Sequence, residues 1–183
     1  FTDTGLESCV HGQQVFGGHG YIREWGQEQL VRDVRIAQIY EGTNGIQALD
    51  LLGRKVLANG GAALNLFISE IRHFAEQHSA PCNSALLDAV LRLERTSAWL
   101  QQQVGHDANS VGAASVEYLH LFGYVAYAYM WARMAVCAEQ KHAEEPDFYS
   151  AKHATAEFFF SRLLPRTLSL EATIRAGSQP LYK

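Results

Sequence analysis

Apolar residues recur at helical spacing through most of this 183-residue chain, from Leu64 onward. The first stripe has spacings of one to four residues and consists of Leu64, Phe67, Ile68, Ile71 and Ala75. The second has spacings of 4, 3, 4, 3 and 4 residues and consists of Leu86, Val90, Leu93, Ser97, Leu100 and Val104. Such stripes mark one face of a helix, and the second is typical of antiparallel packing in a bundle. Because no stretch alternates strictly enough to be a strand, we expect an all-α fold.

Breaks in this periodicity divide the region into helices, at residues 79–84, at residues 105–110, at residues 144–147 and at Pro165. Pro165 either ends the helix before it or begins the next one. The strongest apolar run, residues 118–132, is only 15 residues long. A membrane-spanning helix needs about 20 residues. We therefore expect a long buried bundle helix there and no membrane span.

The first sixty residues have a different character. Nine of the 15 glycines lie before residue 54. A helix over residues 46–57 is followed by Ala58-Asn59-Gly60-Gly61, a typical C-cap and linker. We place a domain boundary there, with residues 1–58 and 59–183 as the two domains. Residues 1–58 are too short and too rich in glycine to bury a core alone, so we expect them to be the end of a larger domain.

Composition and charge exclude several classes of protein. The chain is 48% apolar and 19% charged, which rules out intrinsic disorder. Its net charge of −4 argues against binding to nucleic acid. The three cysteines, Cys9, Cys82 and Cys137, are far apart and odd in number, so we expect a reducing, cytoplasmic location. The start of the chain does not resemble a signal peptide, and the histidines and cysteines lack metal-binding spacings, so we expect no metal site.

A glycine-rich segment, residues 14–21, follows a predicted helix and reads Gln-Val-Phe-Gly-Gly-His-Gly-Tyr. Three glycines in four positions let a backbone approach a ligand closely and expose its N–H groups. The segment matches neither of the common nucleotide-binding motifs. A tight connection between two helices explains it equally well.

The second candidate segment, residues 39–45, reads Ile-Tyr-Glu-Gly-Thr-Asn-Gly. Its carboxylate, Glu41, lies between one helix over residues 32–40 and another starting near Thr43. Thr43 or Asn44 can cap that second helix, whose N-terminus favours an anion or a polarised oxygen. The apolar residues before Glu41 would raise its pKa toward that of a useful base. By spacing alone, a solvated or salt-bridged glutamate is the more common explanation.

Together the two segments form a more specific pattern. It consists of Gln14-x-Phe16-Gly17-Gly18-x-Gly20-Tyr21 followed by Arg32-Asp33-x-x-Ile36-x-x-Ile39-Tyr40-Glu41-Gly42-Thr43, in this order and at this separation. This pattern resembles the C-terminal end of the acyl-CoA dehydrogenases, densely over residues 5–57. The run from Tyr40 to Leu51 looks like the branch of 3-methylmercaptopropionyl-CoA dehydrogenase-like enzymes, which have an extra C-terminal helical domain. Residues 60–183 are similar to that appended domain, mainly in their apolar helical pattern.

The resemblance implies roles for eight residues. Glu41 matches the catalytic base, and Gly42 matches the position where the backbone touches the acyl-CoA thioester. The residues implied to contact FAD are Gln14, Gly17, Gly18, Thr43, Asn44 and Gly45. The first three match a stretch that contacts FAD bound by a neighbouring subunit, so a homo-oligomer is implied. The implied reaction is α,β-dehydrogenation of an acyl-CoA to a trans-2-enoyl-CoA, with an acceptor similar to electron-transfer flavoprotein.

Two other functions remain open at this point. A non-enzymatic helical module for oligomerisation or partner docking would keep residues 60–183 but would not need Glu41 or the glycine-rich segment. A DNA-associated relative of the same fold is disfavoured by the acidic charge balance. The family's FAD-binding body does not match any part of these residues, so we expect the chain alone to be inactive.

Overall fold

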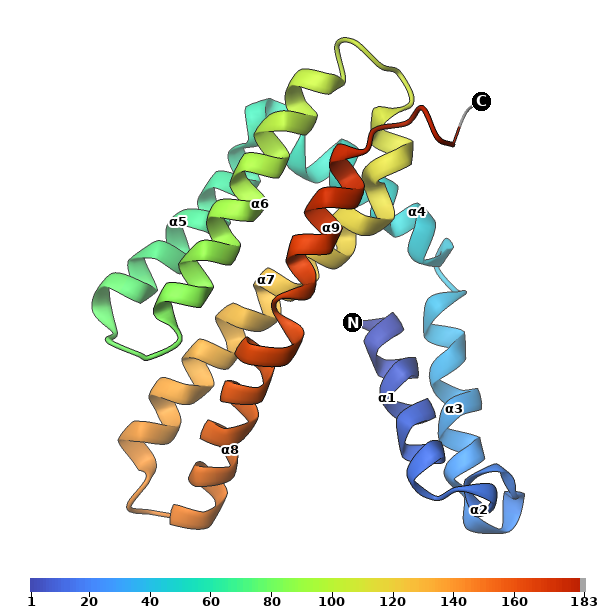
Figure 1. Ribbon diagram of the computed structural model, residues 1–183, viewed down its shortest axis with the longest axis vertical. Coiled ribbons are helices and arrows are strands. Elements are labelled where there is room, and N and C mark those ends of the chain that lie inside the picture. Colours follow the sequence, from blue (N-terminus) through green and yellow to red (C-terminus); the bar gives the residue numbers. More distant parts are fainter. Residues whose placement is uncertain (182–183) are drawn as a thin grey trace. The chain divides into compact units, whose positions relative to one another are not determined.

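The structure, a computed structural model, describes residues 1–181 and is built from helices (Figure 1). The described residues contain no strand, which confirms the predicted all-α fold. The chain divides into two compact units, Phe1–Gln47 and Ala48–Lys183, which we call unit 1 and unit 2. Each unit is described by itself below.

Unit 1 is a helical hairpin in which α1 (Thr2–Val15) and α3 (Gln27–Arg35) lie side by side (Figure 1). The short helices α2 (Gly18–Tyr21) and η1 (Arg23–Trp25) form the connection between them. After α3 a 3-10 turn, η2 (Ile36–Gln38), leads toward α4 (Thr43–Leu49). The helix expected over residues 32–40 therefore begins earlier, at Gln27, and changes to a 3-10 turn before Tyr40. Within residues 1–47 only Gly20 is buried.

Unit 2 consists of two sets of antiparallel helices (Figure 1). In the first set, α5 (Ala62–Gln77) and α6 (Asn83–Gln103) form a hairpin. In the second set, the long helix α7 (Ser110–Lys141) lies along α8 (Pro146–Phe158) and α9 (Arg166–Arg175), which follow one another in the opposite direction. The predicted breaks at residues 79–84, 105–110 and 144–147 are confirmed, and α9 starts directly after Pro165.

Two helical stretches of unit 2 are wider than the α-helices that the sequence predicts. Residues Asp50–Val56 (η3) and Phe159–Leu163 (η5) are π-helical. Their last bonds show the longer repeat, since the Leu57 N–H donates to Leu52 O and the Leu164 N–H donates to Phe159 O, each across five residues. A 3-10 stretch, η4 (Ala58–Gly61), turns the chain from η3 into α5 through positive φ angles at Asn59, Gly60 and Gly61.

The core of unit 2 is formed by the two apolar stripes, one face of α7 and side chains from η3, η5 and α9. Its fully buried large side chains are Leu52, Ile71, Leu86, Val90, Leu93, Leu100, Tyr118, Leu121 and Val125. Ser97, the polar member of the second stripe, is buried too, and its hydroxyl lies 2.6 Å from the Tyr118 hydroxyl. The prediction is wrong for one member of that stripe, since Val104 follows the end of α6 and is exposed. The long bundle helix expected over residues 118–132 is part of α7. No helix in residues 1–181 is long and apolar enough to cross a membrane.

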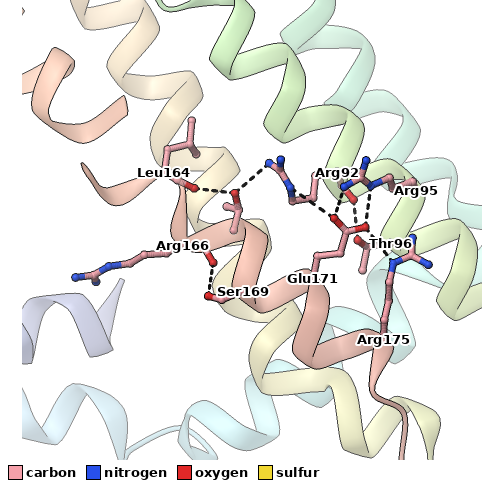
Figure 2. Close-up of polar contacts among 9 residues, drawn as sticks. Arg92, Arg95, Thr96, Leu164, Arg166, Ser169, Glu171 and Arg175 are labelled. Atoms are coloured by element: carbon pink, nitrogen blue, oxygen red, sulfur yellow. Dashed lines mark hydrogen bonds and ion pairs between the residues drawn. The ribbon is translucent and has the colours of Figure 1, made fainter. Parts of the chain in front are cut away.

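A buried carboxylate joins α6 to α9. Figure 2 shows Arg92 and Arg95 of α6 and Arg175 of α9 pointing toward Glu171, and we call these four residues the Glu171 cluster. Glu171 accepts two hydrogen bonds from Arg95, one from Nε at 2.7 Å and one from Nη2. It accepts a third from Arg175 Nε at 3.0 Å. Arg92 Nε lies 3.5 Å from Glu171 Oε2. The Arg95 hydrogen bond is the main cause that holds the pKa of Glu171 below its usual range, and burial opposes it.

We expect Glu171→Gln to destabilise unit 2 by about 2–3 kcal/mol at pH 7, because it leaves the Arg92 guanidinium without its carboxylate. A carboxyl whose pKa is lower in the folded state adds stability above its unfolded pKa of about 4.3. That stability is lost as the pH falls through the folded pKa. The free energy of unfolding, measured with urea, should therefore fall less between pH 7 and pH 3 in Glu171→Gln than in the wild type.

The matched control is Glu94→Gln. Glu94 pairs with Arg72 at 2.7 Å, but both side chains are well exposed, and such surface pairs contribute about 0–1 kcal/mol. The Glu94→Gln variant should retain the wild-type dependence of the free energy of unfolding on pH. Equal effects of the two substitutions would contradict a special role for the Glu171 cluster.

Candidate functional site

The glycine-rich segment lies at the C-terminal end of α1, where the chain turns into α2 (Figure 1). Gly17 has a positive φ of 59°, which favours glycine. At Gly20 a Cβ would lie 2.3 Å from Gln13 O, so the turn is closed too tightly for any side chain there. The Gln13 side chain fastens the turn, since its Nε2 donates to Gly20 O at 3.2 Å. The turn is thus a defined structure with an open outer face.

That open face contains the residues that the sequence singles out. Gly17 and Gly18 are exposed, and a Cβ at either position would meet no atom within 4 Å. Gln14 is exposed beside them, and its side chain makes no hydrogen bond to another residue of the described chain. The neighbouring Gln13, which the sequence did not single out, closes the turn, whereas Gln14 is available to a ligand.

The Glu41 turn, residues 41–43, has a backbone that side chains rarely adopt. The φ angles are 54° at Glu41, 94° at Gly42 and 70° at Thr43. The left-handed region is unfavourable for a β-branched residue such as Thr43, and strained backbone of this kind clusters at active sites and ligand clamps. Glu41, Gly42 and Thr43 are all exposed.

The apolar surroundings expected for the Glu41 carboxylate are not assembled within residues 1–181. Ile36, Ile39 and Tyr40 precede it, but about half of the surface of each is itself exposed, at 55%, 48% and 56%. Large exposed apolar patches mark surfaces that contact another protein segment or a ligand. The exposed Glu41 therefore follows apolar side chains that are themselves left partly uncovered within unit 1.

Hydrogen bonds from neighbouring elements hold the Glu41 turn. Gln47 Nε2 donates to the Glu41 carbonyl oxygen at 2.7 Å. Asn44 Nδ2 donates to Asp3 Oδ1 at 2.7 Å, and the Thr2 hydroxyl lies 2.9 Å from Asn44 Oδ1. Asn44 and Gly45, two of the residues expected at a cofactor, are half-buried. Both ends of the Asn44 amide are thus already used inside unit 1.

The structure places the two candidate segments at opposite ends of α1. The Glu41 turn is tied to Thr2 and Asp3 in the first turn of α1, whereas the glycine-rich segment follows its last residue, Val15. A helix of 14 residues is about 21 Å long. The two segments of one chain therefore do not form one compact cluster of side chains.

Unit 2 contains a cavity of about 510 Å³ at the turn between α5 and α6, facing α7 and α8. Its lining includes His78, Pro81, Ala135, Glu139 and His153. His153 Nε2 is buried without a hydrogen bond within the described chain and lies 3.5 Å from Glu139 Oε2. None of the site residues expected from the sequence lines this cavity, and no group of three or more His, Cys, Asp or Glu side chains in residues 1–181 is arranged to hold a metal ion.

Comparison with known families assigns both parts of the chain. Residues 67–183 match the family model described as "Acetyl-CoA dehydrogenase C-terminal like", and residues 3–57 match "Acyl-CoA dehydrogenase, C-terminal domain". The chain belongs to the acyl-CoA dehydrogenase family. The resemblance expected from the two motifs is confirmed.

Three relatives illustrate the extent of the match within this family. A 3-methylmercaptopropionyl-CoA dehydrogenase of Ruegeria pomeroyi is 37% identical over 171 residues, which are 89% of this chain and 29% of the relative. A broad-specificity linear acyl-CoA dehydrogenase of Mycobacterium tuberculosis is 29% identical over 88% of this chain and 29% of its own length. The caffeyl-CoA reductase-Etf complex subunit CarC of Acetobacterium woodii is 43% identical over 47 residues, 26% of this chain and 12% of that protein. The chain thus spans less than a third of the length of the acyl-CoA dehydrogenases it matches.

The residues of the glycine-rich segment fit a large cofactor of the kind the family resemblance implies. A ligand can lie against the backbone of Gly17 and Gly18 without meeting a side chain, and the Gln14 amide is free to bond it. At the other end of α1, only the backbone of Asn44 is available, because its side chain is bonded to Thr2 and Asp3. The two ends of α1 therefore differ in the polar groups that they leave open to a ligand.

Proposed function

We propose that these 183 residues are the C-terminal part of an FAD-dependent acyl-CoA dehydrogenase that converts an acyl-CoA thioester to a trans-2-enoyl-CoA. The observation that supports this function best is the exposed Glu41 carboxylate on a strained turn, within a chain of this family. In the proposal residues 1–58 complete the helical domain of the dehydrogenase, and residues 59–183 form a second, structural domain.

Glu41 is the general base in this proposal. Its carboxylate takes a proton from the α-carbon of the acyl group, a transfer that requires the thioester carbonyl to be polarised by hydrogen-bond donors. The Glu41 N–H makes no hydrogen bond to another described residue, so it can donate to that carbonyl oxygen. The Gly42 backbone lies next to it at the thioester in this proposal, and its φ of 94° favours a residue without a side chain.

The other residues of the proposal hold the cofactor. When bound, FAD supplies the acceptor for the hydride that leaves the β-carbon. Gln14, Gly17 and Gly18 contact it at one end of α1, and Thr43, Asn44 and Gly45 contact it after the base. Because these two groups lie at opposite ends of a helix about 21 Å long, the glycine-rich segment is suited to FAD bound by a neighbouring subunit, which makes the enzyme a homo-oligomer.

The electron acceptor in this proposal is a protein similar to electron-transfer flavoprotein. The support is the name of one relative, which is a subunit of an Etf complex. The three cysteines, all of them free in the described structure, fit the proposed cytoplasmic location.

The test is to purify the complete enzyme and to assay it with a series of acyl-CoA thioesters and an artificial electron acceptor. We expect a yellow protein that forms trans-2-enoyl-CoA. The competing function, a non-enzymatic oligomerisation or docking module, makes the opposite prediction. A complete protein that binds no flavin, with Gln14→Ala and Gly18→Val variants indistinguishable from the wild type, would favour that module.

The 183-residue chain alone should bind no FAD and oxidise no acyl-CoA. The glycine-rich segment supplies a few polar contacts to one part of the cofactor, and these do not compensate for the freedom that FAD loses on binding. The purified chain should be colourless, and calorimetric titration with FAD should show no saturable heat. A yellow chain with stoichiometric flavin would mean that these residues contain a complete cofactor site.

A further inference from the structure

The Glu41 turn is unusual because three successive residues have positive φ angles, including the β-branched Thr43. A residue stays in such a conformation only where its surroundings hold it there. The proposed base is attached to this turn, so the position of its carboxylate depends on the contacts that keep the turn in place. Those contacts identify further residues that matter for the reaction.

Asp3 makes the contacts that bracket the turn. Its Oδ1 accepts one hydrogen bond from Gln38 Nε2 at 2.5 Å and another from Asn44 Nδ2 at 2.7 Å. Gln38 precedes Glu41 by three residues and Asn44 follows it by three residues. A single carboxylate oxygen on α1 thus fastens the chain on both sides of the proposed base.

Two further bonds complete the arrangement. The Thr2 hydroxyl lies within hydrogen-bonding distance of Asn44 Oδ1, which fixes the orientation of the amide that bonds Asp3. Gln47 Nε2 donates to the carbonyl oxygen of Glu41 itself. Of these residues, Asp3 is the one that connects the segments before and after the turn.

We propose that Asp3 is a positioning residue for Glu41: it holds the turn so that the carboxylate faces the substrate α-carbon. The inference rests on the proposed role of Glu41 as the base. A displacement of about 1 Å from the productive geometry can lower a rate by about 100-fold. Because Asp3 itself does not contact the substrate in this arrangement, its loss affects kcat more than KM.

Asp3 also lies in the first turn of α1, where a negative charge stabilises the helix. Two substitutions separate this general effect from the positioning role. Asp3→Asn removes the charge but keeps an oxygen that can accept both hydrogen bonds. Asp3→Ala removes both the charge and the acceptor.

The experiment compares these variants in the complete enzyme. We expect Asp3→Ala to lower kcat by about 10- to 100-fold with KM for acyl-CoA changed by less than about twofold, and Asp3→Asn to recover most of the rate. In the enzyme without substrate, amide hydrogen exchange over residues 40–47 should be faster in Asp3→Ala than in Asp3→Asn. The matched control is Asp33→Ala, which removes a carboxylate that accepts a hydrogen bond from Gln29 at 2.6 Å on the surface of α3, and it should behave as the wild type.

Wild-type kcat and wild-type exchange in Asp3→Ala would overturn the proposal. Equal losses in Asp3→Ala and Asp3→Asn would also overturn it, because they would assign the effect to the charge at the start of α1. The proposed base is tested separately by Glu41→Gln. If Glu41→Gln retains the wild-type rate, the proposed role of Glu41 as the base is wrong. The exchange measurement then still reports whether Asp3 holds the turn.

Discussion

Glu41→Gln lowers the turnover of the complete enzyme by about 10²–10⁴-fold, the usual contribution of a general base. The amide has nearly the same shape as the carboxylate but cannot accept the α-proton. FAD content and the affinity for acyl-CoA should therefore stay close to those of the wild type. The measurement is kcat and KM with an artificial acceptor, together with the flavin absorbance of the purified variant.

A control on the same unit is Glu7→Gln. Glu7 is an exposed residue of α1 that lies 3.7 Å from His11, four residues along the helix, and its change should leave turnover unaltered. A Glu41→Gln enzyme with near-normal turnover would move the base to a residue outside this chain. A Glu41→Asp variant should retain part of the activity, because it keeps a carboxylate but withdraws it by one methylene.

Leu93→Asp unfolds unit 2 at 25 °C. Leu93 is completely buried in the middle of α6 and belongs to the apolar stripe of that helix. Burying a carboxylate there without a partner costs several kcal/mol, a large part of the 5–15 kcal/mol that typically stabilises a domain. Circular dichroism and the fluorescence of Trp99 and Trp131, both in unit 2, would measure the loss.

The same helix supplies the control for this substitution. Leu91 is two residues away and 51% exposed, so Leu91→Asp should change the free energy of unfolding by less than about 1 kcal/mol. This pair tests which face of α6 forms the core. A stable, native-like Leu93→Asp chain would show that the buried face has been assigned incorrectly.

The helices of unit 2 could be predicted from sequence because the spacing of apolar residues is a local property. The stripe from Leu86 to Leu100 is buried as expected, and the helix ends fall at the predicted prolines and turns. The π-helical stretches η3 and η5 could not be predicted in this way, since an α-helix and a π-helix show nearly the same apolar pattern over five to seven residues. Val104 fits the stripe, but it follows the end of α6 and so leaves the packed face.

The candidate site was predicted less completely. The motifs identify Glu41 and the glycine-rich segment, but they carry no information about the backbone angles of residues 41–43. They also miss Asp3, because its partners Gln38 and Asn44 are 35 and 41 residues away in the sequence. Gln13 was missed for a different reason, since it is adjacent to Gln14 and only the closed turn shows which of the two is used internally.

The length of α7 has a consequence for how unit 2 can be divided. Its 32 residues extend about 48 Å, and its buried positions run from Ser110 to Ala138, in contact with α6, α8, α9 and η3. Deleting any one of these elements would expose an apolar section of α7 to water. Unit 2 should therefore melt in a single cooperative step, because no smaller set of its helices can cover this long helix.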